Sequence, residues 1–241
     1  LHLCDRRQRQ MCIRDRYIAM AGIMFATLIL TFSRGCWIGF MITAGLFVTF
    51  VCGKIWGLAL IALPFLPMVL PESIINRIAS VGDMKDSSTS YRVYIWYGSL
   101  AMVKDFWASG IGPGTQAFKS VYPFYSYSGI VAPHSHNMFL QILVESGIVG
   151  IGVFLTTIVM FFKKLINGYQ STSGKGSKLG AMIVAIGAGV AGFCVQGMFD
   201  NCFYNYRVFL IFWIVLALGI AAVYIAKGEK EESAVKAVEE E

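Results

Sequence analysis

Apolar stretches alternate with polar connections along this chain. Six of the stretches approach the roughly 20 residues of helix needed to cross a hydrocarbon core. Lipid offers no partner to backbone polar groups, so each stretch must pair its own amides and carbonyls as a helix. The sequence therefore predicts an all-α polytopic transmembrane helical bundle of about six spans. The predicted spans are residues 17–32, 37–52, 55–70, 138–162, 179–199 and 208–226.

The longest polar segment, residues 71–137, separates the first three spans from the last three. Basic residues gather in the other connections, at Lys54, within 163–178 and after residue 226. Because cytoplasmic loops carry an excess of Lys and Arg, we expect those connections to be cytoplasmic and the long loop to face outward. The turns at 33–35 and 200–207 then share its side. The expected divisions are 1–16, 17–70, 71–137, 138–226 and an acidic cytoplasmic tail, 227–241.

Residues 1–16 do not fit this pattern of spans and loops. They are polar and rich in arginine, begin without Met, and lack the small-residue cleavage pattern of a secretory signal. We therefore expect a non-native leader. The alternative is a basic cytoplasmic arm before the first span.

Composition agrees with a membrane protein. Hydrophobic residues make up 56% of the chain and charged residues only 14%, against about 25% charged in soluble domains. Membrane lipids are therefore expected partners. The net charge of +6 does not indicate nucleic acid, because the basic residues follow the topology and form no patch interleaved with aromatics. The six cysteines include no C-x-x-C pair, and Cys36, Cys52, Cys194 and Cys202, in or beside the spans, are expected to be packing residues.

Within the loop, the hydroxyls of residues 87–90 could cap a helix that starts near Tyr91. Apolar side chains then recur every three or four residues, which predicts an amphipathic helix docked on protein or at the membrane interface. The expected apolar face comprises Val93, Trp96, Tyr97, Leu100, Val103 and Trp107. A glycine run at 110–114 should end the helix as a loop turn. A backbone nest for an anion is the alternative.

Two further features lie toward the end of the loop. The aromatic tract Tyr122, Phe124, Tyr125 and Tyr127 could form a packed lid or stack on sugar rings. Asn137 is expected to cap the following span, along which Asn137, Gln141 and Glu145 form a polar stripe that should face protein. Glu145 either bonds a neighbouring helix or is a functional membrane carboxylate.

The candidate reactive groups are histidines and arginines. His134 and His136 lie two residues apart without a neighbouring Cys or carboxylate in the sequence, so we expect no metal and no cofactor. His136 could act as a general base near neutral pH or serve a structural role. Arg34, Arg92 and Arg207 are expected on the outward side, where arginine forks suit a diphosphate or pair with carboxylates.

These residues occur in strings that resemble one family. The strings are residues 30–37 (LTFSRGCW), Arg92 and Trp96 followed by 110–114 (GIGPG), and His136-Asn137, Leu140, Glu145-Ser146-Gly147 and Gly150. Their order around one outward loop is similar to that of the O-antigen ligase family, which includes O-antigen polymerases and protein O-oligosaccharyltransferases. The similarity covers roughly residues 25–162.

The resemblance implies a membrane glycosyltransferase of the bacterial inner membrane with its site on the periplasmic face. The donor would be a glycan on undecaprenyl diphosphate, and in the ligase branch the acceptor is the lipid A core. Transfer would invert the anomeric centre without a metal. By the same resemblance, Arg34 and Arg92 would hold the diphosphate and His136 would activate the acceptor hydroxyl. Supporting candidates are His134, Asn137, Glu145 and Arg207.

Other functions stay open at this point. A polymerase or a protein O-oligosaccharyltransferase would use the same chemistry on another acceptor. A transporter would need Arg34, Glu145 and Arg207 to line a solute path. Transporter sites usually lie at the midplane of repeated, interrupted helices, whereas the polar residues here gather at the outward edge and no internal repeat is visible.

Overall fold

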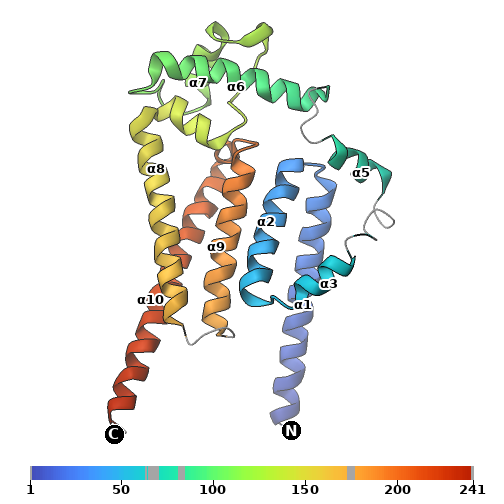
Figure 1. Cartoon of the computed structure of the whole chain (residues 1–241), viewed down its shortest axis with the longest axis vertical. Helices are drawn as coiled ribbons and strands as arrows, with labels where there is room; N and C mark the ends of the chain where they lie inside the picture. The colour runs from blue at the N-terminus through green and yellow to red at the C-terminus, as the bar shows by residue number, and fades with distance from the viewer. Residues whose placement is uncertain (1, 63, 65–70, 81–84, 173–176, 240–241) are drawn as a thin grey trace.

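The computed structural model describes residues 2–62, 64, 71–80, 85–172 and 177–239, and this part of the chain contains helices and no strand. Long helices run side by side, and shorter helices lie across one end of them (Figure 1). Both termini lie toward the opposite end. The expectation of an all-α fold is confirmed.

Four of the described helices are long and apolar enough to cross a membrane. They are α2 (Arg34–Val51), α8 (Met138–Ser171), α9 (Lys178–Gly197) and the first part of α10 (Tyr206–Glu239). These helices match four of the six predicted spans, so a multi-pass membrane protein is confirmed and the number six is not.

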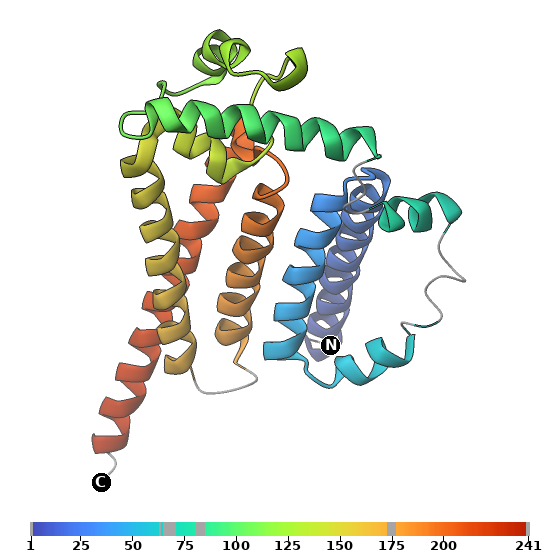
Figure 2. The same ribbon diagram turned by 45° about the horizontal axis from the view of Figure 1, so that its top comes forward.

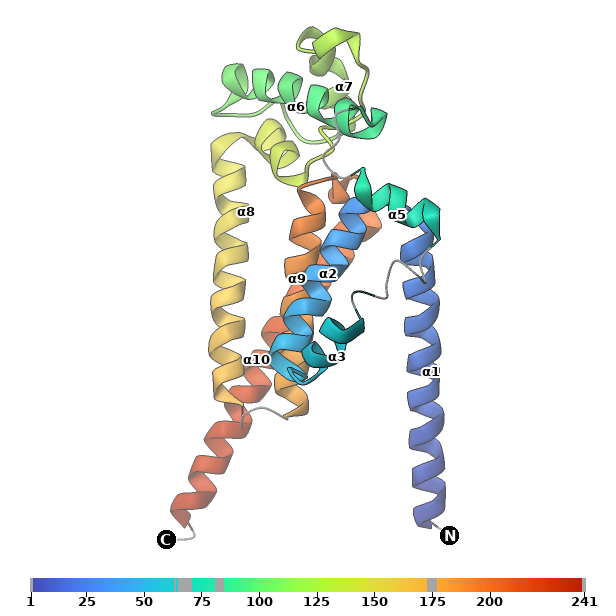
Figure 3. The ribbon, with the colours of Figure 1, turned by 45° about the vertical axis from the view of Figure 1, so that its right-hand side comes forward.

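The two other predicted spans have a different outcome. The first lies in α1 (His2–Leu30), which continues through Arg16 without a break, so the leader at 1–16 stays a prediction. The third begins as α3 (Ile55–Ala62), and its positions 63 and 65–70 lie outside the described residues. Figure 3 shows α1 standing apart from α8.

Close backbone contact joins α2 to α9. A Cβ atom on Gly192 would stand 2.3 Å from the carbonyl oxygen of Gly39, and one on Gly39 would stand 2.6 Å from the carbonyl oxygen of Gly192. Thr43 Oγ1 also donates a hydrogen bond to the carbonyl of Ala188 at 3.2 Å. Small residues allow membrane helices to pack this tightly, where the hydrophobic effect gives little drive. The contact fixes Arg34, at the start of α2, beside the end of α9.

A sharp bend divides α8 at Gly147, whose φ of 63° and ψ of −165° are not helical. Residues 138–146 lie under α6 (Ser87–Phe106), and the remainder descends along the bundle (Figure 2). The carbonyls of Val144 and Glu145 accept hydrogen bonds from Ile111 N at 2.9 Å and Gly112 N at 3.0 Å. The glycine run is therefore a turn that closes this short segment. Because these two amides are already bonded, the anion-nest alternative is not supported.

The long loop folds into helices with a core of their own. It contains α5 (Glu72–Ala79), α6, α7 (Thr115–Val121) and the 3-10 turns Tyr122–Phe124 and Tyr127–Gly129. Helix α6 lies across the ends of the membrane-spanning helices (Figure 2). The core comprises Ile95, Met102, Phe118, Tyr122 and Ala132 of the loop, together with Val144 of α8.

The helix expected in this loop exists, with two corrections. It begins at Ser87 rather than near Tyr91, and the hydroxyl residues form its first turn instead of capping it. The predicted apolar face is not confirmed, because Ile95 and Met102 are fully buried whereas Tyr97 and Trp107 are exposed. The rest of the loop packs on the side of α6 that carries Ile95. Apolar residues occur all around this helix, so their spacing did not indicate which side would be buried.

The aromatic tract forms a packed lid over most of its length. Tyr122 stacks on Phe118, with ring centroids 5.0 Å apart, and Tyr125 Oη donates to Asp105 Oδ2 at 2.6 Å. Phe124 stands clear with 87% of its surface exposed, and Tyr127 is half-exposed although its ring stacks on Tyr94. Stacking on sugar rings by the tract as a whole is not supported.

Candidate functional site

The loop ends against the turn that follows α9. Asn137 Oδ1 accepts a hydrogen bond from Leu140 N at 2.9 Å, which confirms the predicted cap of α8. Its Nδ2 donates to the carbonyl of Met198 at 3.0 Å. His136 has a φ of +51°, a left-handed conformation that is uncommon outside glycine. The backbone N–H of His136 donates to Nδ1 of His134 at 3.2 Å, which stabilises this conformation.

His136 is paired with a carboxylate. Its Nδ1 lies 3.0 Å from Oδ1 of Asp200, which also accepts the backbone N–H of Asn201 at 2.8 Å. Burial opposes ionisation of Asp200, but the hydrogen bond and charge of His136 and the Asn201 amide hold the pKa of Asp200 below its usual value. An ionised Asp200 holds the proton on Nδ1. Nε2 of a neutral His136 is then free to accept a proton.

His134 is unsuited to act as a base near neutral pH. Burial, with a smaller effect from the neighbouring His136, lowers the pKa of His134 to about 4. Its ring lies between those of His136 and Tyr204, with centroids 4.2 Å and 4.8 Å away. Tyr91 of α6 packs edge-on against His136 at 5.8 Å. A row of rings therefore leads from α6 through both histidines to the turn after α9.

His134, His136 and Asp200 are the described residues whose ligand atoms could together hold a cation, since these atoms lie within 4.8 Å of one another. The fold brings Asp200 to the histidines from 64 positions away, so the sequence-based reason against a metal, a missing carboxylate, is wrong. Nδ1 of His134 already accepts the backbone amide of His136, and Nδ1 of His136 meets Asp200. A cation would have to bind through the Nε2 atoms or displace these bonds.

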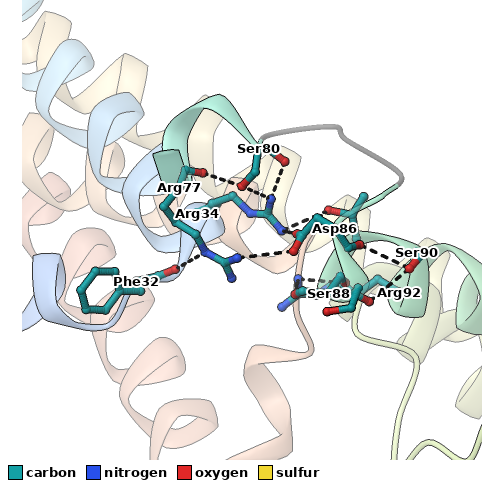
Figure 4. Close-up of polar contacts among 10 residues, drawn as sticks. Phe32, Arg34, Arg77, Ser80, Asp86, Ser88, Ser90 and Arg92 are labelled. Atoms are coloured by element: carbon teal, nitrogen blue, oxygen red, sulfur yellow. Dashed lines mark hydrogen bonds and ion pairs between the residues drawn. The ribbon is translucent and has the colours of Figure 1, made fainter. Parts of the chain in front are cut away.

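Arg34 lies in a network of protein hydrogen bonds (Figure 4). Its guanidinium donates to Oγ of Ser80 at 2.9 Å and Oγ1 of Thr89 at 3.0 Å, and it forms an ion pair with Asp86. The hydrogen bond from Arg34 is the main cause that lowers the pKa of Asp86 from its usual value. Arg34 therefore joins the start of α2 to both α5 and α6.

Two further arginines lie near this network. Arg77 of α5 approaches Oδ1 of Asp86 at 3.5 Å and donates to the carbonyl of Phe32 at 3.3 Å. Arg92 donates to Oγ of Ser88 at 2.8 Å, and its buried Nε has no partner. Arg92 thus has donor capacity left for a ligand, whereas Arg34 is largely occupied.

A cavity of about 530 Å³, here called the arginine cavity, lies between α2, α6 and the end of α9. Arg34, Arg77 and Arg92 line it, together with Asp200. Three buried polar atoms of its wall have no partner, and buried groups of this kind normally do. They are Arg92 Nε, Trp96 Nε1 and Gln196 Oε1. The cavity offers cationic and neutral donors next to the carboxylate that holds His136.

The remaining sequence candidates lie elsewhere. Gln141 Nε2 donates to Glu145 Oε1 at 2.8 Å, and Gln141 Oε1 accepts Ser135 N at 2.7 Å, so the stripe faces protein as expected. Glu145 precedes the bend in α8 and lines a second cavity. Arg207 is exposed and does not line the arginine cavity.

Sequence reasoning missed Arg77, Asp86 and Asp200. Asp200 is the acid of the turn at 200–207, which the charge pattern already placed with the long loop. Arg77 lies in α5 and Asp86 directly precedes α6, both within the same loop. The charge pattern therefore placed all three on the expected side, although it did not distinguish them from the other charged residues there.

Fold and site together define a multi-pass helical membrane protein with a cationic cavity beside a histidine–carboxylate pair. The sequence profile of the O-antigen ligase family matches residues 19–155, more than half of the 241 residues, and this chain belongs to that family. The match includes Arg34, Arg92 and His136 and ends before Asp200. A search of curated proteins found no match. Membership supports a ligase-like or polymerase-like membrane glycosyltransferase.

Proposed function

We propose that this chain transfers a glycan from undecaprenyl diphosphate to a lipid A core or another surface acceptor, with inversion and without a metal. The observation that carries the proposal is the arginine cavity, whose unpartnered donors lie beside the His136–Asp200 pair. The donor diphosphate is a buried dianion that needs such donors. The reaction would take place at the bacterial inner membrane, on the periplasmic face.

The diphosphate would lie against Arg92 and Arg77, with Trp96 Nε1 as a neutral donor. Arg34 would act mainly through Asp86 and Thr89, by holding α6 and α5 around the cavity. In this arrangement Arg34 is mainly a positioning residue, although it also lines the cavity. Fixed guanidinium groups in a poorly solvated site stabilise the negative charge that develops on the leaving group.

The transfer step would use His136 as general base. Nε2 accepts the proton of the acceptor hydroxyl while the hydroxyl oxygen bonds to the anomeric carbon, and the bond from that carbon to the phosphate oxygen breaks. Undecaprenyl diphosphate leaves with the bonding electrons. Asp200 fixes the ring through Nδ1 and stabilises the imidazolium that forms. General-base catalysis typically contributes about 10²–10⁴-fold to the rate.

Glycan transfer in membranes that contain the protein tests this function. The donor is glycan-linked undecaprenyl diphosphate, and the acceptor is lipid A core. We expect wild type to transfer, and His136→Gln to lose at least about 100-fold in rate at matched abundance. Lys119→Ala, an exposed change on α7, is the control that retains the rate.

Two results would change the proposal. Full activity of His136→Gln would assign His136 a structural role. Wild-type membranes that extend the lipid-linked glycan without modifying lipid A core would identify a polymerase, and a polymer-length assay detects this directly.

A further inference from the structure

A second cavity, of about 490 Å³, lies between the bend of α8 and the start of α10. The turn after α9 connects it to the arginine cavity, because Asp200 lines the arginine cavity and the next residue, Asn201, lines the second one. Its size falls in the ordinary range for small-molecule sites. Neither the histidine pair nor the arginine network accounts for it.

Its wall combines aromatic rings with a few neutral or acidic polar groups. Tyr204, Tyr206 and Trp213 supply rings, while Gln141 and Glu145 supply an amide and a carboxylate. None of the described residues that line it is basic. A diphosphate would therefore meet Glu145 with no cation to offset the repulsion. An aromatic wall with polar groups instead suits a sugar ring, which has apolar C–H faces and a rim of hydroxyls.

Asn201 gives an independent indication of a ligand. Asn201 is buried, with 8% of its surface exposed, and its Oδ1 has no hydrogen-bond partner. A buried acceptor without a donor costs about 1–3 kcal/mol. The backbone N–H of Asn201 is already used by Asp200, so the turn is held without this side chain. A hydroxyl in the cavity would satisfy Oδ1.

We propose that this second cavity binds the acceptor sugar whose hydroxyl attacks the donor. The inference rests on the proposed function and adds a location for the acceptor and the residues that recognise it. Tyr204 of this cavity contacts His134, which contacts His136, which bonds Asp200 of the arginine cavity. An inverting displacement requires the nucleophile and the leaving group on opposite sides of the reacting carbon. The contacts through Tyr204 and Asp200 bring one cavity to each end of the histidine pair, so a donor in one and an acceptor in the other would meet beside it.

Binding is tested first without any transfer reaction. Saturation-transfer NMR on the purified full chain would use methyl glycosides of glucose, galactose and N-acetylglucosamine as probes. We expect a signal from at least one glycoside with wild type and a signal at least threefold weaker with Tyr206→Ala. Tyr206 is 69% exposed, so its removal should not affect folding. Tyr224→Ala, an exposed tyrosine outside the cavity on the same helix, is the matched control.

Asn201→Leu is the second variant. It removes the unpartnered oxygen, so the protein should be at least as thermally stable as wild type while glycoside binding falls. Unchanged glycoside signals in both variants, or no signal from any glycoside with wild type, would overturn the acceptor site. If Asn201→Leu fails to fold, Tyr206→Ala alone decides.

Kinetics then separate the acceptor from the donor. Tyr206→Ala should raise KM for lipid A core about tenfold and leave KM for the lipid-linked donor within twofold. A rise confined to the donor KM would show that the cavity holds the donor glycan or its isoprenoid chain, and would refute the inference. Absence of transfer by wild type would instead count against the proposed function, while glycoside binding would still decide the acceptor site.

Discussion

Nδ1 of His136 lies 3.0 Å from Oδ1 of Asp200, although 64 positions separate the two residues in the sequence. The pair joins the end of the long loop to the turn between α9 and α10. It also selects one imidazole tautomer, because the carboxylate accepts the proton on Nδ1 and leaves Nε2 as an acceptor. The proposed role of His136 as a base therefore depends on a residue outside the segment that matches the family profile.

Asp200→Asn tests this dependence. An asparagine in place of the carboxylate can donate to Nδ1 and favour the wrong tautomer, and it no longer stabilises the imidazolium. We expect kcat for glycan transfer to fall by up to about 10⁴-fold with little change in KM, because the same substitution beside the histidine of a Ser-His-Asp triad has an effect of that size. Asp200→Glu keeps a carboxylate and should retain more of the rate than Asp200→Asn. Equal losses in the two variants would indicate a purely structural role for Asp200.

The Arg34 network predicts a defect in assembly rather than in binding. Arg34→Ala would leave the Asp86 carboxylate with the longer contact to Arg77 and the hydroxyl of Thr89, and would release α5 and α6 from α2. We expect membrane abundance to fall at least about threefold, as it does for losses of stability of this kind. Arg34→Lys keeps the charge without the fork and should give an intermediate level. Immunoblots of fractionated membranes provide the measurement. Wild-type abundance of Arg34→Ala would show that the network is dispensable for folding.

Arg92→Ala should behave in the opposite way. Arg92 makes few protein hydrogen bonds and has an unpartnered Nε, so its removal affects the ligand more than the fold. One charge-assisted hydrogen bond is worth about 1.5–3 kcal/mol. The donor KM or kcat/KM should therefore worsen roughly 10- to 100-fold at wild-type abundance. Arg207→Ala, outside the arginine cavity, is the matched control, and equal effects of the two changes would contradict a specific role for Arg92.

Much of the architecture could be predicted from sequence. Apolar length identified four of the membrane helices, and the distribution of Lys and Arg placed the loop 71–137 with the turns at 33–35 and 200–207. The structure brings these three segments together at one end of the bundle. Local rules also succeeded at Asn137, because a cap depends on residues three positions apart.

Features that depend on distant packing could not be predicted. The buried face of α6 is selected by Phe118 and Tyr122 of the folded loop, and the apolar spacing within α6 contains no information on them. The bend at Gly147 results from hydrogen bonds to the turn near residue 110, and a single glycine in an apolar helix does not predict such a bend. The partners of Arg34 and His136 come from other segments of the chain, so neither ion pair follows from local spacing.

His134 predicts an acid-sensitive fold. Because its pKa is about 4 in the folded protein and near 6.5 in an unfolded chain, the unfolded state binds the additional proton between these values. Stability conferred by neutral His134 is therefore complete above about pH 6.5 and declines as the pH falls toward 4. Of the groups that face His134, the charge of His136 lowers the pKa of His134 and the charge of Asp200 raises it, so their effects partly cancel. The pKa of Asp200 is itself lowered, so Asp200 titrates below this window.

Thermal unfolding in detergent between pH 7 and pH 5 measures this effect. We expect the apparent unfolding temperature of wild type to fall by roughly a few degrees over this interval. His134→Asn places an amide oxygen where Nδ1 accepts the amide of His136 and cannot titrate, so its decline should be smaller. Parallel declines in the two proteins would show that other groups cause the acid sensitivity.

The contact between the glycine run and the bend of α8 gives the last prediction. A Cβ on Gly110 would stand 2.3 Å from the carbonyl oxygen of Glu145, and Gly110 also has a φ of +68°. Gly110→Ala would therefore combine backbone strain of about 1–2 kcal/mol with a clash against backbone, which cannot move aside cheaply. Gly112 is the matched control, since it has a φ of +94° but no atom within 4 Å of the added Cβ.

We expect Gly112→Ala to lower the apparent unfolding temperature modestly and Gly110→Ala to lower it at least twice as far. Glycan transfer should follow the same order, because displacement of residues 138–146 would move Gln141 and Glu145 relative to His136. Thermal unfolding and transfer rates, measured on the same preparations, test both statements. Equal effects of the two substitutions would show that only the left-handed backbone matters and that the close contact with the carbonyl of Glu145 does not hold the bend in place.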